Sequence, residues 1–262
     1  MSKGKYYFSK SLEKGLNILA LFTKDSPTLT QSEIAKILGL NMTTTYRYIN
    51  TLVEMGYLEK DLKTKVIRPS LHCLFLCINL MHSIDNLKMI KEVVNEINRK
   101  SNISIDVVFA ENDTLMRIYH KEATETLTYR LPEFSKNSLH NTALGKAYLS
   151  SLPDGLIDEK ITAMELVQKT PKTIVDKVKL FEEIEITKRR GFAMVDEEYL
   201  PGVLAIAAPL YDSITGLGVG AVSFDFSVLE HNGAEIKAKY GEMIQETARV
   251  LSELLPAGKT TG

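Results

Sequence analysis

This sequence of 262 residues has only two cysteines, only short apolar runs and a net charge close to zero. Its two cysteines, Cys73 and Cys77, stand four residues apart and would share one face of a helix, which excludes a disulfide framework. The longest apolar stretch, 71–81, is interrupted by His72 and Asn79, whereas a bilayer-spanning helix needs about 20 apolar residues. The first residues also lack the apolar core of a signal peptide. These absences predict a cytoplasmic protein in a reducing compartment.

The net charge is only −1, which by itself argues against a nucleic-acid partner, but the charges are unevenly distributed. Residues 1–68 contain eleven lysines and arginines and six acidic residues, a net charge of +5, and the rest of the chain is acidic. A basic segment joined to an acidic one is typical of a nucleic-acid-binding domain fused to a second domain, although chance asymmetry between solvated surfaces is the alternative. The length and the 44% hydrophobic content accommodate two folded domains.

The first part of the chain has the pattern of a winged helix-turn-helix. The segment Thr30–Glu33 is an S/T-x-x-E capping box that opens a helix, and Gly39 supplies the left-handed turn after that helix. Asn41 caps a third helix, which Gly56 ends, and the hydrophobic period then changes to two. The expected helices are 11–24, 31–38 and 42–55, and the expected strands of the wing are 57–60 and 65–68.

The third helix of a helix-turn-helix lies in the major groove of DNA. Its inward face begins at Thr45 and continues through Ile49 and Leu52. Threonine hydroxyls bond to phosphates or base edges, and Arg47 has two open roles, a guanine contact or a phosphate contact. Basic residues of the wing neutralise phosphates or reach the minor groove, unless the winged helix serves only protein contacts. The candidate DNA-binding residues are Gln31, Thr43, Thr44, Thr45, Arg47, Tyr48, Thr51, Lys63, Lys65 and Arg68.

The segment 70–83 follows the wing with apolar residues at helical spacing, among them Leu71, Leu74 and Phe75. Such a helix is too apolar to stand alone in water, so we expect it to pack against another surface. The predicted domains are a winged helix-turn-helix at 9–69, a linker helix at 70–84 and a larger domain at 85–255.

The larger domain alternates expected strands and helices. Short, hairpin-like connections favour an antiparallel or mixed sheet over a doubly wound parallel one. The expected helices are 86–100, 141–151, 156–162, 173–190 and 234–255, and the expected strands are 103–110, 115–121, 127–131, 192–195, 204–211 and 218–226.

Several runs of residues resemble the IclR-type transcriptional regulators, named for the isocitrate lyase regulator. Ser11–Leu19 resembles the opening helix of that family, and Thr51–Leu58 resembles the stretch before its wing. His140–Ala147 is similar to the family segment H-x-T-A-x-G-K-A. Each motif is weak alone, but their order along residues 9–250 is specific. Further motifs in the family's order are Thr170–Ile174, Gly191-Phe192, Asp196–Glu198, Gly202-Val203 and Ala207–Pro209.

The resemblance implies an α+β protein with a winged helix-turn-helix, a linker helix and a GAF-like effector domain built on an antiparallel sheet. It also implies a homodimer or dimer of dimers on palindromic double-stranded operator DNA, controlled by a small and usually acidic metabolite. A helix N-terminus, here at 141–144, can hold a carboxylate. The effector-binding residues that the resemblance implies are Tyr129, Leu131, Asn137, Thr142, Ala143, Leu144, Val195, Val203, Ala205, Ser223 and Asp225.

The expected pocket departs from the family's usual pattern at three places. Val195 stands where the family often has a polar residue, Leu204-Ala205 where it often has Arg-Cys, and Asp225 where it often has Ser. One wall is therefore more apolar and the floor carries an acid. We expect an effector larger and more apolar than a two- or three-carbon keto acid, such as an aromatic or hydroxylated carboxylate. The alternative is that Val195 and Ala205 only fill the core.

Other chemistry finds weaker support in the sequence. Cys73 and Cys77 with neighbouring histidines fit core packing better than a zinc site, and Gly216–Gly220 lacks the spacing of a dinucleotide fingerprint. Asp196–Glu198 fits a solvated or helix-capping cluster better than an acid–base pair, and His140 either orients the pocket helix or is a core histidine. No nucleophile–base arrangement is visible, so we expect a regulator without cofactor or metal rather than an enzyme that carries a regulatory winged helix.

Overall fold

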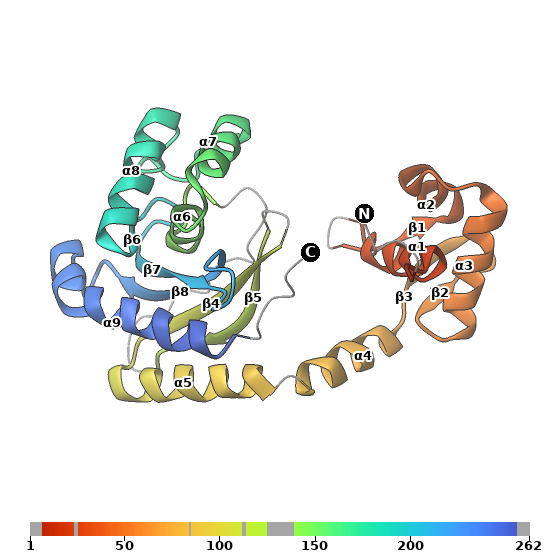
Figure 1. The fold of residues 1–262 in the computed structure, drawn as a ribbon, viewed down its shortest axis with the longest axis horizontal. Helices are drawn as coiled ribbons and strands as arrows, with labels where there is room; N and C mark the ends of the chain where they lie inside the picture. The colour runs from red at the N-terminus through yellow and green to blue at the C-terminus, as the bar shows by residue number, and fades with distance from the viewer. Residues whose placement is uncertain (1–6, 24–25, 84, 112–113, 125–138, 256–262) are drawn as a thin grey trace. The chain divides into compact units, whose positions relative to one another are not determined.

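A computed structural model of the chain describes residues 7–23, 26–83, 85–111, 114–124 and 139–255 (Figure 1). The chain divides into two compact units, 1–84 and 85–262, and each is described by itself. The strand expected at 127–131, and with it Tyr129, Leu131 and Asn137 of the expected effector site, lie outside the described residues.

The first unit is a winged helix-turn-helix followed by one further helix. Its three strands are antiparallel in the order β1-β3-β2, with Leu29 opposite Ile67 and Glu59 opposite Arg68. The strand β1 is an addition to the expected elements, because two residues are too few to show a hydrophobic period. The elements are α1 (Lys10–Ala20), β1 (Leu29–Thr30), α2 (Gln31–Leu38), α3 (Met42–Glu54), β2 (Leu58–Lys60), β3 (Val66–Pro69) and α4 (Leu71–His82).

Local capping interactions set the helix-turn-helix. Thr30 and Glu33 form the reciprocal capping box: the Glu33 carboxylate accepts the Thr30 N–H at 2.7 Å, and the Thr30 hydroxyl accepts the Glu33 N–H at 3.4 Å. Gly39 ends α2 with a φ of 62°, a left-handed conformation in which a side chain would be strained. The Asn41 side chain then accepts the Thr44 N–H at 2.8 Å and starts α3. The predicted boundaries of α2 and α3 follow from these residues.

The second unit contains one five-stranded antiparallel sheet in the order β5-β4-β8-β7-β6. This arrangement confirms the α+β class and the antiparallel sheet expected for the larger domain. The elements are α5 (Asp85–Ser101), β4 (Ser104–Glu111), β5 (Thr114–Lys121), α6 (Ala143–Ser150), α7 (Asp154–Ala163), α8 (Lys177–Arg190), β6 (Ala193–Asp196), β7 (Val203–Tyr211), β8 (Gly218–Ser227) and α9 (Gly233–Glu253).

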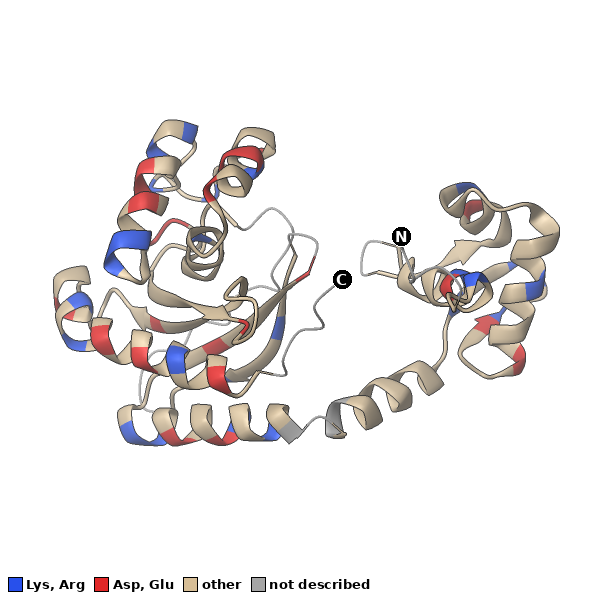
Figure 2. Ribbon diagram, viewed as in Figure 1, with Lys and Arg blue, Asp and Glu red and all other residues tan. Residues whose placement is uncertain are grey.

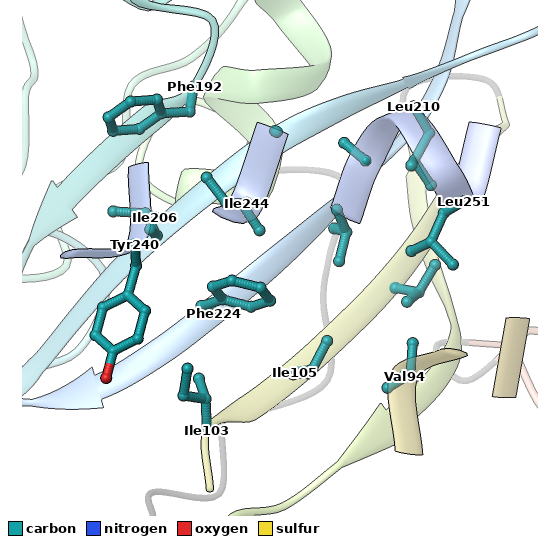
Figure 3. Packing of buried hydrophobic residues seen from close by; sticks show 14 of the residues in the cluster. Val94, Ile103, Ile105, Phe192, Ile206, Leu210, Phe224, Tyr240, Ile244 and Leu251 are labelled. Carbon is teal, nitrogen blue, oxygen red and sulfur yellow. The ribbon is translucent and has the colours of Figure 1, made fainter. Parts of the chain in front are cut away.

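The two faces of this sheet carry different side chains. On β8, Phe224 points into a core with α5 and α9 (Figure 3). Its neighbours Ser223 and Asp225 alternate with it and lie on the other face, near the start of α6. Figure 1 shows α6 on one face of the sheet and α5 and α9 on the other. Figure 3 shows Phe224 among apolar side chains of β4, β7 and α9, including Ile105 and Ile244. Burial of such a side chain contributes roughly 1.5–3 kcal/mol, so this core fixes the register that places Ser223 and Asp225.

Two helices begin later than expected. Helix α6 begins at Ala143 because the Thr142 side chain caps it, accepting the Gly145 N–H at 3.0 Å. Helix α8 begins at Lys177 rather than 173, because the Thr173 hydroxyl is bonded elsewhere and donates to the Glu198 carbonyl at 2.6 Å. Thr173 therefore holds a loop and does not continue a helix.

Candidate DNA-binding and effector-binding sites

The outward face of α3 carries most of the side chains expected to contact DNA. Thr43, Arg47 and Thr51 are exposed at a spacing of four residues, and Thr44 is half-buried beside them. The Thr51 hydroxyl donates to the Arg47 carbonyl at 2.9 Å and retains its acceptor capacity. These four residues therefore form one accessible strip on α3.

The structure contradicts the prediction that Thr45 contacts DNA. Its side chain is completely buried within the first unit, and its hydroxyl donates to the Asn41 carbonyl at 3.0 Å. Helical periodicity places it on the inward face with Ile49 and Leu52, so it stabilises the start of α3 and is not available to DNA.

The two tyrosines of α3 lie in different environments. Tyr48 is half-buried against the core that contains Ile18 and Ile49. Tyr46 is 49% exposed, and the Lys60 ammonium lies 5.4 Å from the centre of its ring. Tyr46 was missed as a candidate, although it follows Thr43 by three residues and so shares the outward face. A contact of Tyr48 with DNA stays a prediction, and its half-buried position suits packing better.

Gln31 connects the two helices of the helix-turn-helix. Its side-chain amide donates to the Met42 carbonyl at 3.1 Å, which ties the start of α2 to the start of α3. This bond orients α3 relative to α2. A direct contact of Gln31 with DNA stays a prediction.

The wing presents Lys63 and Lys65 to solvent, whereas Arg68 is already paired. The Arg68 guanidinium lies 2.8 Å from the Glu59 carboxylate across β2 and β3. The Asp61 carboxylate accepts the Thr64 N–H at 3.0 Å and the Lys63 N–H at 2.7 Å, and these two bonds lower the pKa of Asp61 and hold the turn. Figure 2 shows that lysines and arginines are interspersed with acidic residues along the ribbon of the first unit. The surface is therefore basic but not uniformly so.

In the second unit, the start of α6 and the strands β6, β7 and β8 line a cavity with a volume of about 30 Å³. Every described residue that we expect to bind the effector lies in its lining, and Tyr199 and Leu200 complete it. Both additions lie in the β6–β7 connection, where the large side chains of Tyr199 and Leu200 directly after two acidic residues were the available signal. The lining consists of Thr142, Ala143, Leu144, Val195, Tyr199, Leu200, Val203, Ala205, Ser223 and Asp225.

The start of α6 presents backbone N–H groups at this cavity. Thr142 caps the Gly145 N–H, and an α-helix supplies no acceptor for the N–H groups of Ala143 and Leu144 in its first turn. Gly145 is required here, because a Cβ atom would lie 2.4 Å from the Leu139 Cα. Close packing of α6 against Leu139 thus fixes the helix end that faces the cavity.

The floor of the cavity is acidic, and an unexpected polar cluster adjoins it. Burial and the neighbouring charge of Asp106 raise the pKa of Asp225 well above its usual range. Asp106 is fully buried and accepts bonds from Arg117 Nε at 2.7 Å and His120 Nδ1 at 3.1 Å. Sequence analysis missed Asp106, Arg117 and His120. A charged residue in the middle of the apolar β4 strand was the signal.

The acidic run 196–198 and His140 do not line the cavity. Asp196 is exposed and pairs with Lys172 at 2.8 Å, whereas Glu198 is buried, 2.5 Å from the Lys146 ammonium. Burial raises the pKa of Glu198 and Lys146 opposes that effect. The His140 ring donates from Nε2 to the Val167 carbonyl at 3.0 Å, and burial lowers its pKa. Glu198 and His140 therefore make structural contacts outside the lining of the cavity.

Both cysteines lie on α4. The Cys73 thiol donates to the Tyr57 carbonyl at 3.1 Å, and Cys77 is exposed. Within the described part of the chain, no three His, Cys, Asp or Glu side chains are grouped as metal ligands. No helix in that part has the length and apolarity needed to cross a membrane.

Comparison with known families identifies both units. The model described as "Bacterial transcriptional regulator IclR C-terminal" matches residues 78–253, and that of the "IclR helix-turn-helix domain" matches residues 11–62. The chain belongs to the IclR family. As an IclR regulator it is a DNA-binding transcriptional regulator, and the winged helix-turn-helix of the first unit is its DNA-binding domain.

Relatives of similar length support the family assignment. The HTH-type transcriptional regulator BhcR of Paracoccus denitrificans is 25% identical over 253 residues, which cover 97% of this IclR chain and 90% of BhcR. An IclR family regulator from Brucella abortus has a similar fold, with a TM-score of 0.73 at 19% identity over 97% of this chain and 95% of that one. An IclR homolog from Microbacterium hydrocarbonoxydans complexed with 4-hydroxybenzoate also has a similar fold, with a TM-score of 0.67 at 16% identity. The match covers 94% of this chain and 98% of that one.

Proposed function

We propose that this IclR regulator binds a small carboxylate in the cavity at the start of α6, and that the bound carboxylate changes its affinity for operator DNA. The observation that carries the proposal is the meeting of residues from α6, β6, β7 and β8 around one cavity, with a helix N-terminus in its wall. The N–H groups of Ala143 and Leu144 and the dipole of α6 favour an anionic group there.

The rest of the lining supports an effector with an apolar body. Val195, Val203 and Ala205 form one wall and offer no side-chain hydrogen bond. The bound 4-hydroxybenzoate of the Microbacterium hydrocarbonoxydans homolog supports an aromatic or hydroxylated acid. The free cavity of about 30 Å³ has room for about two waters, whereas a cavity that holds benzene is about 150 Å³. A ring-bearing effector therefore requires displacement of the wall, and we propose that Tyr199 and Leu200 move.

We further propose a homodimer, or a dimer of dimers, as the DNA-binding form. Helix α4 exposes large apolar side chains to solvent, including Leu71 at 72%, Phe75 at 63% and Leu74 at 55%. Such a helix face is covered in most soluble proteins, and a second copy of the same helix is its expected cover. A two-fold dimer would present two α3 helices to half-sites about 34 Å apart.

Effector binding is tested with the purified chain and a set of carboxylates. Benzoate, 4-hydroxybenzoate, glyoxylate and pyruvate would be compared by thermal shift and by fluorescence anisotropy on duplexes from the region upstream of its own gene. An aromatic acid should stabilise the second unit and change DNA affinity, because a ligand that distinguishes two states shifts their populations. Stabilisation by the keto acids alone contradicts the aromatic class. Stabilisation by none contradicts the effector site.

The variant Ala205→Leu fills the cavity and should abolish the thermal shift while DNA binding remains. Its matched control is Ala163→Leu, which adds the same atoms at an exposed position at the end of α7 and should respond to acids as the wild type does. Absence of salt-dependent DNA binding in all three proteins contradicts the assignment of the DNA-contacting residues.

A further inference from the structure

The β6–β7 connection is the part of the cavity wall that no helix or strand holds in place. Of the described lining residues, Tyr199 and Leu200 belong neither to a strand nor to the capped start of α6. The lining strands are paired along the sheet, and α6 packs closely against Leu139. An effector that needs more room than the free cavity of about 30 Å³ therefore displaces this connection.

Both ends of the connection are fixed. Before it, the buried Glu198 carboxylate lies 2.5 Å from the Lys146 ammonium. After it, the Gly202 carbonyl accepts the Val228 N–H at 3.0 Å, directly before β7 begins. The short stretch 199–201 between these two points is therefore the part of the connection that can take another path.

One side chain closes this stretch. The Glu197 carboxylate accepts the Gly202 N–H at 2.7 Å through Oε1, and its Oε2 atom lies 2.5 Å from the Lys172 ammonium. Glu197 thus bridges the two ends of the connection, and Lys172 fixes the direction of its side chain. The bond to Lys172 and then the bond to Gly202 lower the pKa of Glu197, so it is a carboxylate at neutral pH.

The backbone of Glu197 is strained. Its φ is 56°, in the left-handed region that favours glycine, and glutamate is seldom found there. Such residues persist where surrounding contacts over-determine them, and they cluster at ligand clamps and switch regions. Here the Thr170 hydroxyl donates to the Glu197 carbonyl at 2.7 Å, and the Glu197 N–H donates to the Val203 carbonyl at 2.8 Å. The strained conformation directs the carboxylate to the Gly202 N–H.

We infer that Glu197 holds the β6–β7 connection closed, and that the effector binds the form in which the bond between Glu197 and the Gly202 N–H is broken. Glu197 does not line the cavity and acts through Tyr199 and Leu200, so it is a positioning residue. The inference rests on the proposed effector site and adds what opposes entry of the ligand. The observed affinity is then the intrinsic affinity reduced by the fraction of open protein.

The variant Glu197→Ala removes the closing bond and should therefore bind the effector more tightly than the wild type does. Benzoate, 4-hydroxybenzoate, glyoxylate and pyruvate are titrated into the full chain by calorimetry at pH 7. Loss of one hydrogen bond should shift the opening equilibrium about threefold to tenfold, and affinity for any acid that binds the wild type should rise by that factor. Weaker binding overturns the inference. Unchanged binding also overturns it, because rotation of the Tyr199 and Leu200 side chains would then suffice.

Two further variants separate the closing bond from the charge. Glu197→Gln retains an oxygen that accepts the Gly202 N–H but does not pair with Lys172, so its affinity should stay within about twofold of the wild type. The matched control is Glu96→Ala, which removes an exposed carboxylate that pairs with Lys100 at 2.6 Å on α5 and should not change affinity. An increase in either variant equal to that of Glu197→Ala would assign the effect to charge and overturn the inference.

Hydrogen–deuterium exchange tests the closed connection without any ligand. In Glu197→Ala, peptides that cover 196–204 should exchange about threefold to tenfold faster than in the wild type, whereas peptides from β8 and α9 should not change. Glu197→Gln should resemble the wild type. Unchanged exchange at 196–204, or faster exchange throughout the second unit, overturns the inference, because the second result would show a general structural role.

These outcomes distinguish the inference from the proposed function. Failure of the wild type and of Glu197→Ala to bind any of the four acids contradicts the effector site, and with it the statement that the effector binds the open form. Binding that Ala205→Leu blocks but Glu197→Ala does not tighten leaves the effector site standing and contradicts only the role of Glu197.

Discussion

The ammonium of Lys146 lies 2.5 Å from the carboxylate of Glu198, and both side chains are buried. Lys146 belongs to α6, whose first residues form one wall of the cavity, and Glu198 directly precedes Tyr199 and Leu200 of the opposite wall. The pair therefore joins the two walls. A second bond, from the Ile174 N–H to the other Glu198 oxygen at 3.3 Å, attaches the loop before α8 to the same carboxylate.

Removal of one partner of this pair should destabilise the second unit strongly. Lys146→Met leaves the Glu198 carboxylate buried and uncompensated, for which we expect a loss of about 3–5 kcal/mol in the free energy of unfolding. The double variant Lys146→Met/Glu198→Gln should recover most of that loss, because the amide oxygen still accepts the Ile174 N–H and no charge remains. Urea denaturation, followed by a signal of the second unit, measures both.

The matched control is Lys172→Met, which removes an exposed lysine that pairs with Asp196 and Glu197. Water screens that pair, so the control should lose much less stability than Lys146→Met. Equal losses in the two single variants would contradict the structural role of burial at Lys146.

His140 makes the stability of the second unit depend on pH. Burial lowers the pKa of His140 below its ordinary value of 6.5, so the unfolded chain binds a proton more readily than the folded one. The folded state should be favoured above pH 6.5 and lose stability as the pH falls below it. His140→Gln keeps a donor for the Val167 carbonyl and does not titrate, so its loss over the same range should be smaller. Parallel denaturation curves at pH 8 and pH 5 test this, and equal losses contradict it.

Local residue patterns predicted the elements of this fold better than its site. The Thr30–Glu33 capping box and the Gly39 turn act within a few residues, so the sequence shows them directly. The Lys146–Glu198 pair joins residues 52 apart and depends on how α6 packs on the sheet. No local period reveals such a contact.

The cavity lining shows the same division. A resemblance to the family, and not any periodicity, placed Val195 and Ser223 in one site. Asp106 could not be assigned from the sequence, because its effect depends on the strand register that sets it beside Asp225. The prediction that Thr45 contacts DNA was wrong for the opposite reason, because the sequence did contain the decisive information. The helical position of Thr45 on the inward face of α3 was visible, and this position, not the general ability of threonine to contact DNA, determines its burial.

Replacement of Tyr46 by alanine should mainly lower DNA affinity, whereas replacement of Tyr48 by alanine should mainly lower stability. Tyr46→Ala removes an exposed ring from the outward face of α3 and should change the free energy of unfolding by less than about 0.5 kcal/mol, while lowering DNA affinity several-fold. Tyr48→Ala removes a half-buried ring and should cost about 1–3 kcal/mol of stability. Thermal denaturation and fluorescence anisotropy on one operator duplex measure the two effects. Unchanged DNA affinity in Tyr46→Ala removes Tyr46 from the reading surface.

The ion pair of the wing should restrain DNA binding. Glu59→Gln releases the Arg68 guanidinium from its partner and removes a negative charge, so DNA affinity should rise several-fold. The slope of log affinity against log salt concentration should become steeper by about one, because one more counterion is displaced from DNA. Lys63→Ala should make the same slope shallower by about one. In the protein that retains Glu59, Arg68→Ala should change this slope less than Lys63→Ala does. In the Glu59→Gln protein, the two substitutions should change the slope equally. A slope that Glu59→Gln leaves unchanged would show that Arg68 does not reach a phosphate.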